Sequence, residues 1–408
     1  MNSTLLKRQR EHSVELLKQL IAIPSGNPHV SDADEKEIAQ FLRDELKSAG
    51  FQVNLQPITS TYTIAGPRGH KAFTRPNVIA RLGEKNRGPK LILNGHLDTV
   101  SGTNMRNPFR PRIQGDKLYG RGSSDMKGGV AAIVAAAEGV QASAEPLRGE
   151  LVLSLVVDEE TLGCGTKSFL EEEESGDLAI VAEPTENTLG LAQAGYLDFD
   201  ITCKGESRHG QTALLHSSAF LQATSILNQI ANDPALIRRQ KQNGVRMKST
   251  FNAAPIRPVQ HPSLAWMTLE EFRVNCLLGL VPGHSVNDSE RTAKAAVDRV
   301  KYHITIANAH GCNCSVERSS WDIGFIQPAI GYVRGFEKAM KDVLGHSKRS
   351  YVQSFCDATH FYRAGIPTIL FGPGRMELGH SSNEYVSIHE VQDATQVLMH
   401  AIETTLSK

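Results

Sequence analysis

Five short segments carry acids or histidines of the kind that bind metal ions. They are "NGHLDTV" with His96 and Asp98, "GRGSSDMKGG" with Asp125, "VVDEE" with Glu159 and Glu160, "AEPT" with Glu183, and "GPGRMELGH" with His380. Imidazole nitrogens and carboxylate oxygens are ligands of Zn²⁺-like ions. Two histidines and three or more carboxylates suit a pair of such ions bridged by one carboxylate, which would lower the pKa of a shared water and polarise a carbonyl. These residue types predict metal-assisted hydrolysis.

The elements that must position these residues are buried strands. Apolar runs rich in Val, Ile and Leu occur at residues 77–82, 90–96, 150–157 and 178–182, with helical segments between them. Such continuous runs are typical of strands buried on both faces in an α/β sheet. In an open parallel sheet, the carboxyl ends of the strands form the crevice where ligands bind, and three of these runs lead into His96, Glu160 and Glu183. Asp125 stands at the start of an Ala-rich helix, where an acid is favoured.

The hydrophobic pattern of the strand-like segments changes twice along the chain, which predicts one domain inserted into another. After residue 185 the strands alternate apolar and polar residues, as strands with one wet face do, and the order is strand-helix-strand-strand-helix-strand. Near residue 330 the first pattern, continuous apolar runs alternating with helical segments, returns. We predict a first part of the main domain at 1–193, an inserted α+β, ferredoxin-like domain at 194–316, and the second part of the main domain at 317–408.

Composition and charge favour small-molecule partners. The 408 residues include 44 Lys and Arg and 44 Asp and Glu, so no net charge attracts nucleic acid or an anionic membrane. No window approaches the roughly 20 apolar residues of a transmembrane helix. The N-terminus indicates an amphipathic helix ending near Pro24 and no export signal, so we expect a cytoplasmic protein whose six cysteines are free thiols.

The motifs together resemble one enzyme family. "GHLDTV", "GRGSSDMKGG", "DEETLGCGT", "AEPT", "GESRHG" and "GPGRMELGHSSNEYV" occur in the order and near the spacing of the co-catalytic metallohydrolases that include acetylornithine deacetylase, succinyl-diaminopimelate desuccinylase and glutamate carboxypeptidase. The resemblance covers nearly the whole chain. It implies a zinc-peptidase-like catalytic domain, with a mostly parallel sheet flanked by helices, and an inserted lid and dimerisation domain.

The resemblance also implies roles for the residues. His96 and Glu183 would bind one metal ion, Glu160 and His380 the other, and Asp125 would bridge the two. Asp98 would orient His96 from behind, and Glu159 would be the general base. The ions would be Zn²⁺, with Co²⁺ or Mn²⁺ as alternatives. A cis peptide bond would follow the bridging residue, between Asp125 and Met126.

His209, in "KGESRHGQT", matches the family's histidine that reaches the active site of a neighbouring subunit across a dimer. The resemblance therefore implies a homodimer, formed through the inserted domain, in which His209 donates to the oxyanion. The alternative is an ordinary loop histidine.

The chain departs from the family where substrate is often bound. The family commonly has an Asp-x-Arg pair shortly before a Pro-Gly in the lid, and its Arg often binds a substrate carboxylate. Here Leu277 and Gly279 occupy those positions, and Arg246, Arg257 and Arg273 are the candidate substitutes.

We predict a hydrolase that cleaves the amide bond of an N-acyl amino acid or a related small amide. The alternatives are a dipeptidase or glutamate-carboxypeptidase-like exopeptidase, and a homologue that binds ligand without catalysis. The last is disfavoured because the catalytic acids and histidines are all present.

Overall fold

A computed structural model describes residues 3–28, 31, 33–63, 70–143, 145–173, 175–212, 214–242, 244–256 and 266–406. The chain divides into two compact units. The first comprises Met1–Leu191, Gln327–Ser350 and Cys356–Lys408, and the second comprises Ala192–Ile326 with Tyr351–Phe355. The predicted inserted domain, 194–316, falls within the second unit.

The first unit contains a mixed sheet whose centre is parallel. Its strands, in sheet order, are β1 (Gln52–Thr63), β2 (His70–Gly83), β6 (Glu150–Val156), β3 (Lys90–His96), β7 (Leu178–Val181), β17 (Thr368–Leu370) and β8 (Leu189–Gln193). The last two residues of β8 belong to the second unit and pair there with β15 (Phe325–Ile326). β16 (Arg349–Val352), which also pairs with β8, begins in the first unit and ends in the second. The four strands from β6 to β17 run parallel, whereas β2 and β8 run antiparallel to their neighbours β6 and β17. The predicted strands therefore form one sheet, with its parallel part at the centre.

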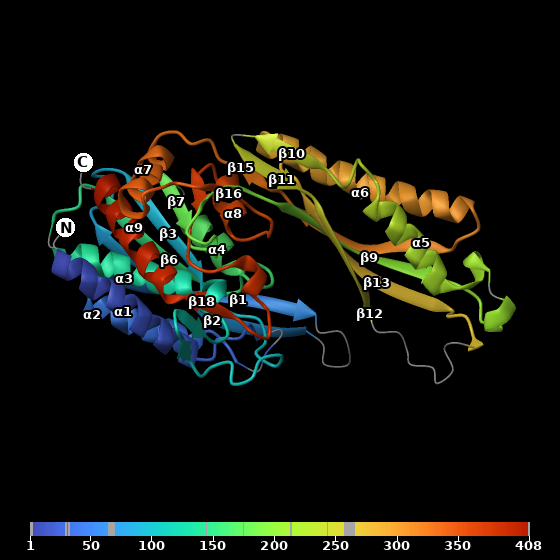
Figure 1. The fold of residues 1–408 in the computed structure, drawn as a ribbon, viewed down its shortest axis with the longest axis horizontal. Helices are drawn as coiled ribbons and strands as arrows, with labels where there is room; N and C mark the ends of the chain where they lie inside the picture. The colour runs from blue at the N-terminus through green and yellow to red at the C-terminus, as the bar shows by residue number, and fades with distance from the viewer. Residues whose placement is uncertain are drawn as a thin grey trace. The chain divides into compact units, whose positions relative to one another are not determined.

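Helices cover both faces of this sheet. The helices of this unit are α1 (Ser3–Ala22), α2 (Lys36–Ser48), α3 (Gly128–Ser143), α4 (Cys164–Glu172), α7 (Tyr332–Leu344), α8 (Ala358–Arg363) and α9 (Ile388–Leu406). Figure 1 shows α1, α3 and α9 side by side, and they share one hydrophobic cluster with α2, α7 and alternate residues of β3 and β6. On β3 these are Leu91 and Leu93, whereas Asn94 faces α4, where it contacts Thr166. Because side chains alternate along a strand, His96 projects to the same side as Asn94.

Close packing at the start of α3 brings this helix against a strand end of the site. A Cβ on Gly129 would collide with the carbonyl oxygen of Ala182, the residue before Glu183. Only glycine permits this approach, because any side chain would push α3 away from the end of β7.

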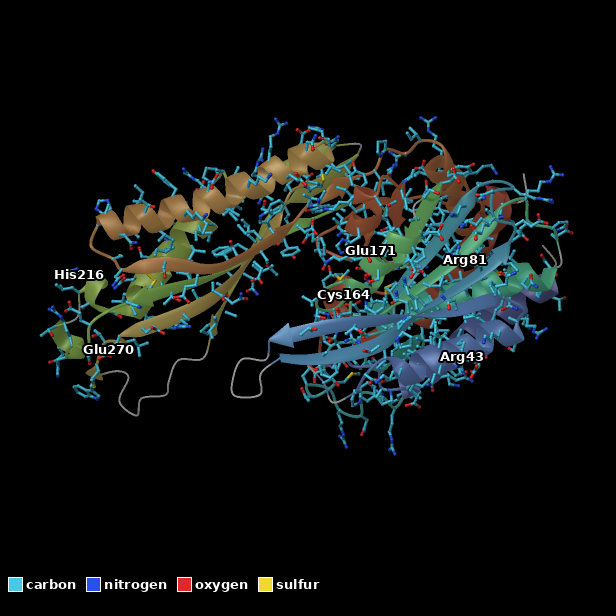
Figure 2. The ribbon with its side chains drawn as sticks, turned by 180° about the vertical axis from the view of Figure 1, so that it is seen from behind. Arg43, Arg81, Cys164, Glu171, His216 and Glu270 are labelled. Atoms are coloured by element: carbon cyan, nitrogen blue, oxygen red, sulfur yellow. A yellow bond between two sulfur atoms is a disulfide. The ribbon has the colours of Figure 1, made fainter. Side chains whose placement is uncertain are left out.

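Ion pairs tie the antiparallel edge of the sheet to its neighbours. Arg81 of β2, labelled in Figure 2, lies 2.9 Å from Glu150 at the start of β6 and 2.5 Å from Glu173 after α4. A small sheet of β18 (Tyr385–Ser387), β5 (Lys117–Tyr119) and β4 (Arg112–Gln114) completes the unit. Among the described helices, none combines the length and apolar character needed to cross a membrane.

The second unit is an α+β layer built on an antiparallel sheet. The sheet order is β12 (Thr250–Ile256), β13 (Glu271–Leu280), β9 (Gly195–Lys204) and β14 (Cys314–Asp322), and α5 (Ala219–Ala231) and α6 (Val286–Ala309) pack on it through a shared hydrophobic cluster. Along β9, buried and half-buried residues alternate at first, as the sequence pattern predicts. A hairpin of β10 (Arg239–Gln242) and β11 (Val245–Lys248) was not predicted, because this region lacks clear periodicity.

One prediction about the cysteines is wrong. Cys203 on β9 and Cys314 on β14 are opposite each other in the sheet and form a disulfide. Cys164, Cys276 and Cys312 are free thiols. The pairing was not visible in the sequence, because 111 residues separate the two cysteines and only the register of β9 and β14 brings them together.

Candidate metal centre

The ends of three neighbouring parallel strands lie level at one edge of the sheet. β3 pairs with β6 so that His96 is opposite Val156, and with β7 so that Asn94 is opposite Val181. His96 ends β3, and Glu183 follows β7 by two residues. The acid turn, residues 158–160, follows β6. Parallel register therefore carries groups from three distant segments to the same place, as expected for an open α/β sheet.

His96 is surrounded by carboxylates. Its Nε2 atom lies 3.1 Å from Asp125 Oδ1, 3.8 Å from Glu159 Oε2 and 3.9 Å from Glu183 Oε1. The His96 and Glu183 side chains are almost completely buried, and the Asp125 and Glu159 side chains are only 10% and 12% exposed. Three buried acids packed this closely around one imidazole need a positive charge between them.

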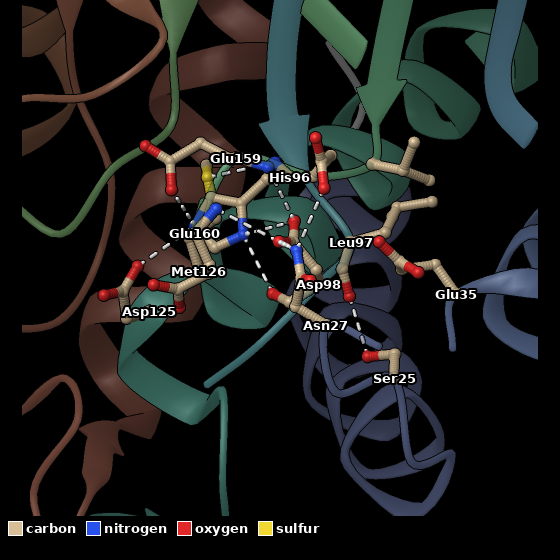
Figure 3. Close-up of polar contacts among 12 residues, drawn as sticks. Ser25, Asn27, Glu35, His96, Leu97, Asp98, Asp125, Met126, Glu159 and Glu160 are labelled. Carbon is tan, nitrogen blue, oxygen red and sulfur yellow. Dashed lines mark hydrogen bonds and ion pairs between the residues drawn. The ribbon is translucent and has the colours of Figure 1, made fainter. Parts of the chain in front are cut away.

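His380 completes the cluster from a loop after β17. Its Nε2 atom lies 2.9 Å from Glu160 Oε2 and 3.4 Å from Asp125 Oδ2. Asp125 therefore faces His96 with one carboxylate oxygen and His380 with the other. The structure thus brings together all five residues predicted as metal ligands, with Asp125 in the middle, and Figure 3 shows its position relative to His96 and Glu160.

The predicted cis peptide bond is confirmed. The bond between Asp125 and Met126 is cis, in a turn of residues Ser123–Lys127 just before α3. The sulfur of Met126 lies 3.2 Å from the backbone nitrogen of His96. This turn therefore contacts the end of β3 directly.

Asp98 supports more of the site than predicted. His96 Nδ1 lies 2.9 Å from the Asp98 carbonyl oxygen and 3.6 Å from its carboxylate. The carboxylate instead accepts hydrogen bonds from the backbone N–H groups of Glu159 (3.1 Å) and Glu160 (3.0 Å), and from the Asn27 side chain (2.9 Å) (Figure 3). Asp98 therefore holds the acid turn, whereas its carbonyl is the nearer partner of His96.

A second buried network behind the acid turn was missed by sequence reasoning. Arg75 of β2 lies 2.6 Å from Asp158 and 3.0 Å from Glu35, and all three side chains are fully buried. Asn27 also approaches Asp158, at 3.3 Å. The only signal in the sequence was a charged residue within the strand pattern "FTRPNVI", which does not identify its partners.

The ionisation of the cluster is strongly perturbed. Burial and the negative charge of Asp125 raise the pKa of Glu183 to about 8. Hydrogen bonds to Asp125 and Glu160 raise the pKa of His380 to about 10. Burial opposes protonation of His96, but the charge of Glu159 and hydrogen bonds to Asp125 and Asp98 outweigh it, so the His96 pKa is raised well above its usual range. Acids and histidines here compete for protons in the absence of another cation.

The donor set fits divalent metal ions. The possible ligand atoms of His96, Asp125 and Glu160 all lie within 4.8 Å of one another. The same is true of the possible ligand atoms of His96, Glu159 and Glu183. Glu160 Oε1 is buried and has no hydrogen-bond partner among the described residues. An orphaned carboxylate oxygen inside a ring of nitrogen and oxygen donors is what a cation would satisfy.

His209 and the positions that depart from the family lie in the second unit. His209 is exposed, and its ring is 6.2 Å from that of Trp266. Leu277 of β13 is 46% exposed, and Gly279 follows it on the same strand. Of the three candidate arginines, Arg246 is exposed on β11, Arg273 pairs with Glu271 at 2.8 Å, and Arg257 lies outside the described residues.

Similarity to known proteins agrees with the geometry. The sequence profile of Peptidase family M20/M25/M40 matches residues 92–404, which include all five predicted ligands. The chain belongs to this family. It is therefore an M20 metallohydrolase, and the predicted resemblance and enzyme class are confirmed.

Relatives of this M20 chain differ in their named activities. A Peptidase M20 domain-containing protein of Schizosaccharomyces pombe is 34% identical over 212 residues, 49% of each chain. The acetylornithine deacetylase of Pectobacterium carotovorum is 24% identical over 416 residues, covering 95% of this chain and 96% of that protein. The crystal structure of human carnosine dipeptidase 1 superposes with a TM-score of 0.77 at 14% identity, covering 99% of this chain and 98% of the other. The M20 fold is therefore shared across deacylases and peptidases.

Proposed function

We propose that this M20 enzyme hydrolyses the amide bond of an N-acyl amino acid or a related small amide, releasing a carboxylate and an amine. The observation that carries the proposal is the convergence of His96 and His380 on Asp125, at 3.1 Å and 3.4 Å, with three further carboxylates around them. The curated relative named acetylornithine deacetylase, which aligns over 95% of this chain, supports the deacylase assignment.

His96 and Glu183 would hold one divalent ion, Glu160 and His380 the other, and Asp125 would contact both. We propose Zn²⁺, with Co²⁺ or Mn²⁺ as alternatives, because all three accept nitrogen and carboxylate donors. When bound, such a pair lowers the pKa of a water molecule and polarises the scissile carbonyl.

Glu159 would move the protons of the reaction. Its carboxylate lies 3.8 Å from His96 Nε2 and is not in the set that we assign as ligands. In the mechanism it accepts a proton from the attacking water and returns it to the leaving nitrogen, while water adds to the carbonyl carbon and the C–N bond breaks. Burial raises the pKa of Glu159 well above its usual range, although the charge of His96 opposes this, and a raised pKa favours a group that must carry a proton.

The assignment of Glu159 is tested by replacing it with Gln. Turnover should fall about 10²- to 10⁴-fold, as expected for the loss of a general acid–base, while the metal content stays unchanged. Glu171→Gln is the control, because Glu171 is an exposed residue of α4. Normal turnover by the Glu159 variant would refute the mechanism.

A substrate panel separates the deacylase from its alternative. A dipeptidase or glutamate-carboxypeptidase-like exopeptidase would use the same residues, since both reactions break a C–N bond next to a carbonyl. We expect N-acetyl, N-succinyl or N-carbamoyl amino acids to be cleaved faster than dipeptides. Faster cleavage of dipeptides would assign the peptidase function instead. Metal analysis of the same preparation identifies the native ion.

We further propose a homodimer in which His209 of one subunit donates a hydrogen bond to the oxyanion in the other subunit's site. The exposed position of His209 in the second unit is compatible with a contact to another chain. His209→Ala should lower kcat and leave the metal content unchanged. A monomeric species with full activity in solution would contradict the role across subunits.

A further inference from the structure

A buried carboxylate that no metal assignment uses organises the turn of Asp125. Glu384, in the segment before β18, is fully buried. Its Oε2 accepts hydrogen bonds from Arg121 Nη1 (2.6 Å) and the Gly122 backbone N–H (3.0 Å). Its Oε1 accepts from the backbone N–H groups of Ser124 (3.0 Å) and Asp125 (3.1 Å). One side chain thus fixes the backbone on which Asp125 is carried.

The same contacts extend to His380. Arg121 donates from Nη2 to Asn104 Oδ1 at 2.5 Å. Asn104 in turn donates from Nδ2 to the backbone carbonyl oxygen of His380 at 3.0 Å. A continuous chain of hydrogen bonds therefore runs from Asp125 through Glu384, Arg121 and Asn104 to His380.

His380 needs such support more than the other predicted ligands do. His96 and Glu183 are anchored by buried strands, and the acid turn is held by Asp98. His380 lies on a loop, and its side chain is 55% exposed. A ligand on an exposed loop loses conformational freedom on binding an ion, and a contact that restricts the loop beforehand reduces this loss.

We propose that Asn104, Arg121 and Glu384 are positioning residues that set the spacing between Asp125 and His380, and so strengthen binding of the ion that Asp125, Glu160 and His380 share. This inference rests on the ligand set of the proposed function. Asn104 acts through the backbone of His380, and Glu384 acts through the backbone of Asp125.

The test is retention of zinc by the purified full-length holoenzyme, dialysed against graded concentrations of chelator. His380→Ala defines the release step of the ion in question. Asn104→Ala should release the same ion at a chelator concentration at least about tenfold lower than the unsubstituted enzyme does, as expected when a group that supports a metal ligand is lost. It should leave binding of the other ion unaffected. Arg106→Ala is the control, since Arg106 is an exposed residue of the same loop.

Asn104→Asp separates the two hydrogen bonds of Asn104, the one with Arg121 and the one with His380. An aspartate keeps an acceptor for Arg121 but has no N–H to donate to His380. It should therefore weaken binding of the same ion, although it adds a negative charge. Equal zinc retention by both Asn104 variants and the parent, with a clear loss in His380→Ala, would overturn the inference and leave the proposed function intact. If His380→Ala and the unsubstituted enzyme release zinc at the same chelator concentration, the proposed ligand set itself would be contradicted.

Discussion

At the scale of single residues, Asp98 has a role that its spacing from His96 did not indicate. A strand places residues two apart on the same side, which led to the prediction that Asp98 orients the imidazole. β3 ends at His96, however, and beyond this point the chain turns so that the Asp98 carboxylate accepts the N–H groups of Glu159 and Glu160. The predicted base and one predicted ligand therefore depend on the same carboxylate.

Asp98→Asn should weaken metal binding or turnover by about 10- to 100-fold, because an amide has one acceptor oxygen where the carboxylate uses both. Its NH₂ group would face a backbone N–H. Zinc retention and kcat measure the effect, and Asp44→Asn, an exposed change on α2, is the control. Wild-type values for both quantities would show that the acid turn holds its shape without Asp98.

At the scale of elements, the end of α1 is tied to the turn that carries Asp125. Lys127 is fully buried, and its Nζ atom donates to the carbonyl oxygens of Leu20 (2.8 Å) and Ile23 (2.9 Å). These carbonyls belong to the C-terminal end of the helix, where backbone acceptors lack helical partners. Burial lowers the pKa of Lys127 to about 7.

Lys127→Met should lower the free energy of unfolding by about 1 to 3 kcal/mol for each carbonyl left without a donor. Methionine fills similar volume, so the loss reports the hydrogen bonds. Chemical denaturation measures it, with Lys85→Met, in an exposed turn, as the control. An equal stability of the two variants would mean that water replaces the ammonium.

His12 links α1 to α3 in a pH-dependent way. Its Nε2 lies 2.7 Å from Glu138, and this hydrogen bond, together with the charges of Glu138 and Glu45, raises the His12 pKa above 6.5 against the effect of burial. A raised folded pKa stabilises the fold below pH 6.5, and the contribution is lost as pH rises through the folded pKa. His12→Asn should therefore cost more stability near pH 6 than near pH 9. Urea denaturation at both values tests this, with His346→Asn, an exposed change, as the control.

At the scale of the whole molecule, the two units are stabilised by different means. The first unit gathers Asp125, Glu159, Glu160 and Glu183 in one buried cluster, and such a cluster is costly without a cation. The second unit holds none of the five predicted ligands and is built on its own hydrophobic cluster, with one disulfide between β9 and β14. Their stabilities should therefore respond differently to chelation.

Removal of the ions should lower the unfolding temperature of the first unit, because a ligand at 100 times its Kd contributes about 2.7 kcal/mol to the folded state. Calorimetry should resolve a transition that shifts with chelator and returns with added Zn²⁺, beside one that does not move. A first transition that is unchanged after complete loss of metal would contradict this prediction.

Much of the fold, and the convergence of the five candidate ligands, was predictable because it depends on local patterns. Continuous apolar runs predicted β3, β6 and β7, and the residues at their ends followed from the parallel arrangement. The hairpin β10–β11 was missed, since each strand has only four residues and β10 contains no apolar residue. The disulfide was missed because its geometry depends on strand register in the second unit.

The sequence by itself determined which side chains are available, and on which strand ends His96, Glu160 and Glu183 would stand, because hydrophobic periodicity fixes strands locally. Only the tertiary structure decided what holds these groups in place. Arg75 reaches Asp158, Glu384 reaches the Asp125 turn, and Asn104 reaches His380 from 276 residues away in the chain. Such polar partners have no period in the sequence, since their hydrogen bonds form between segments that meet only when the sheet and its loops have folded.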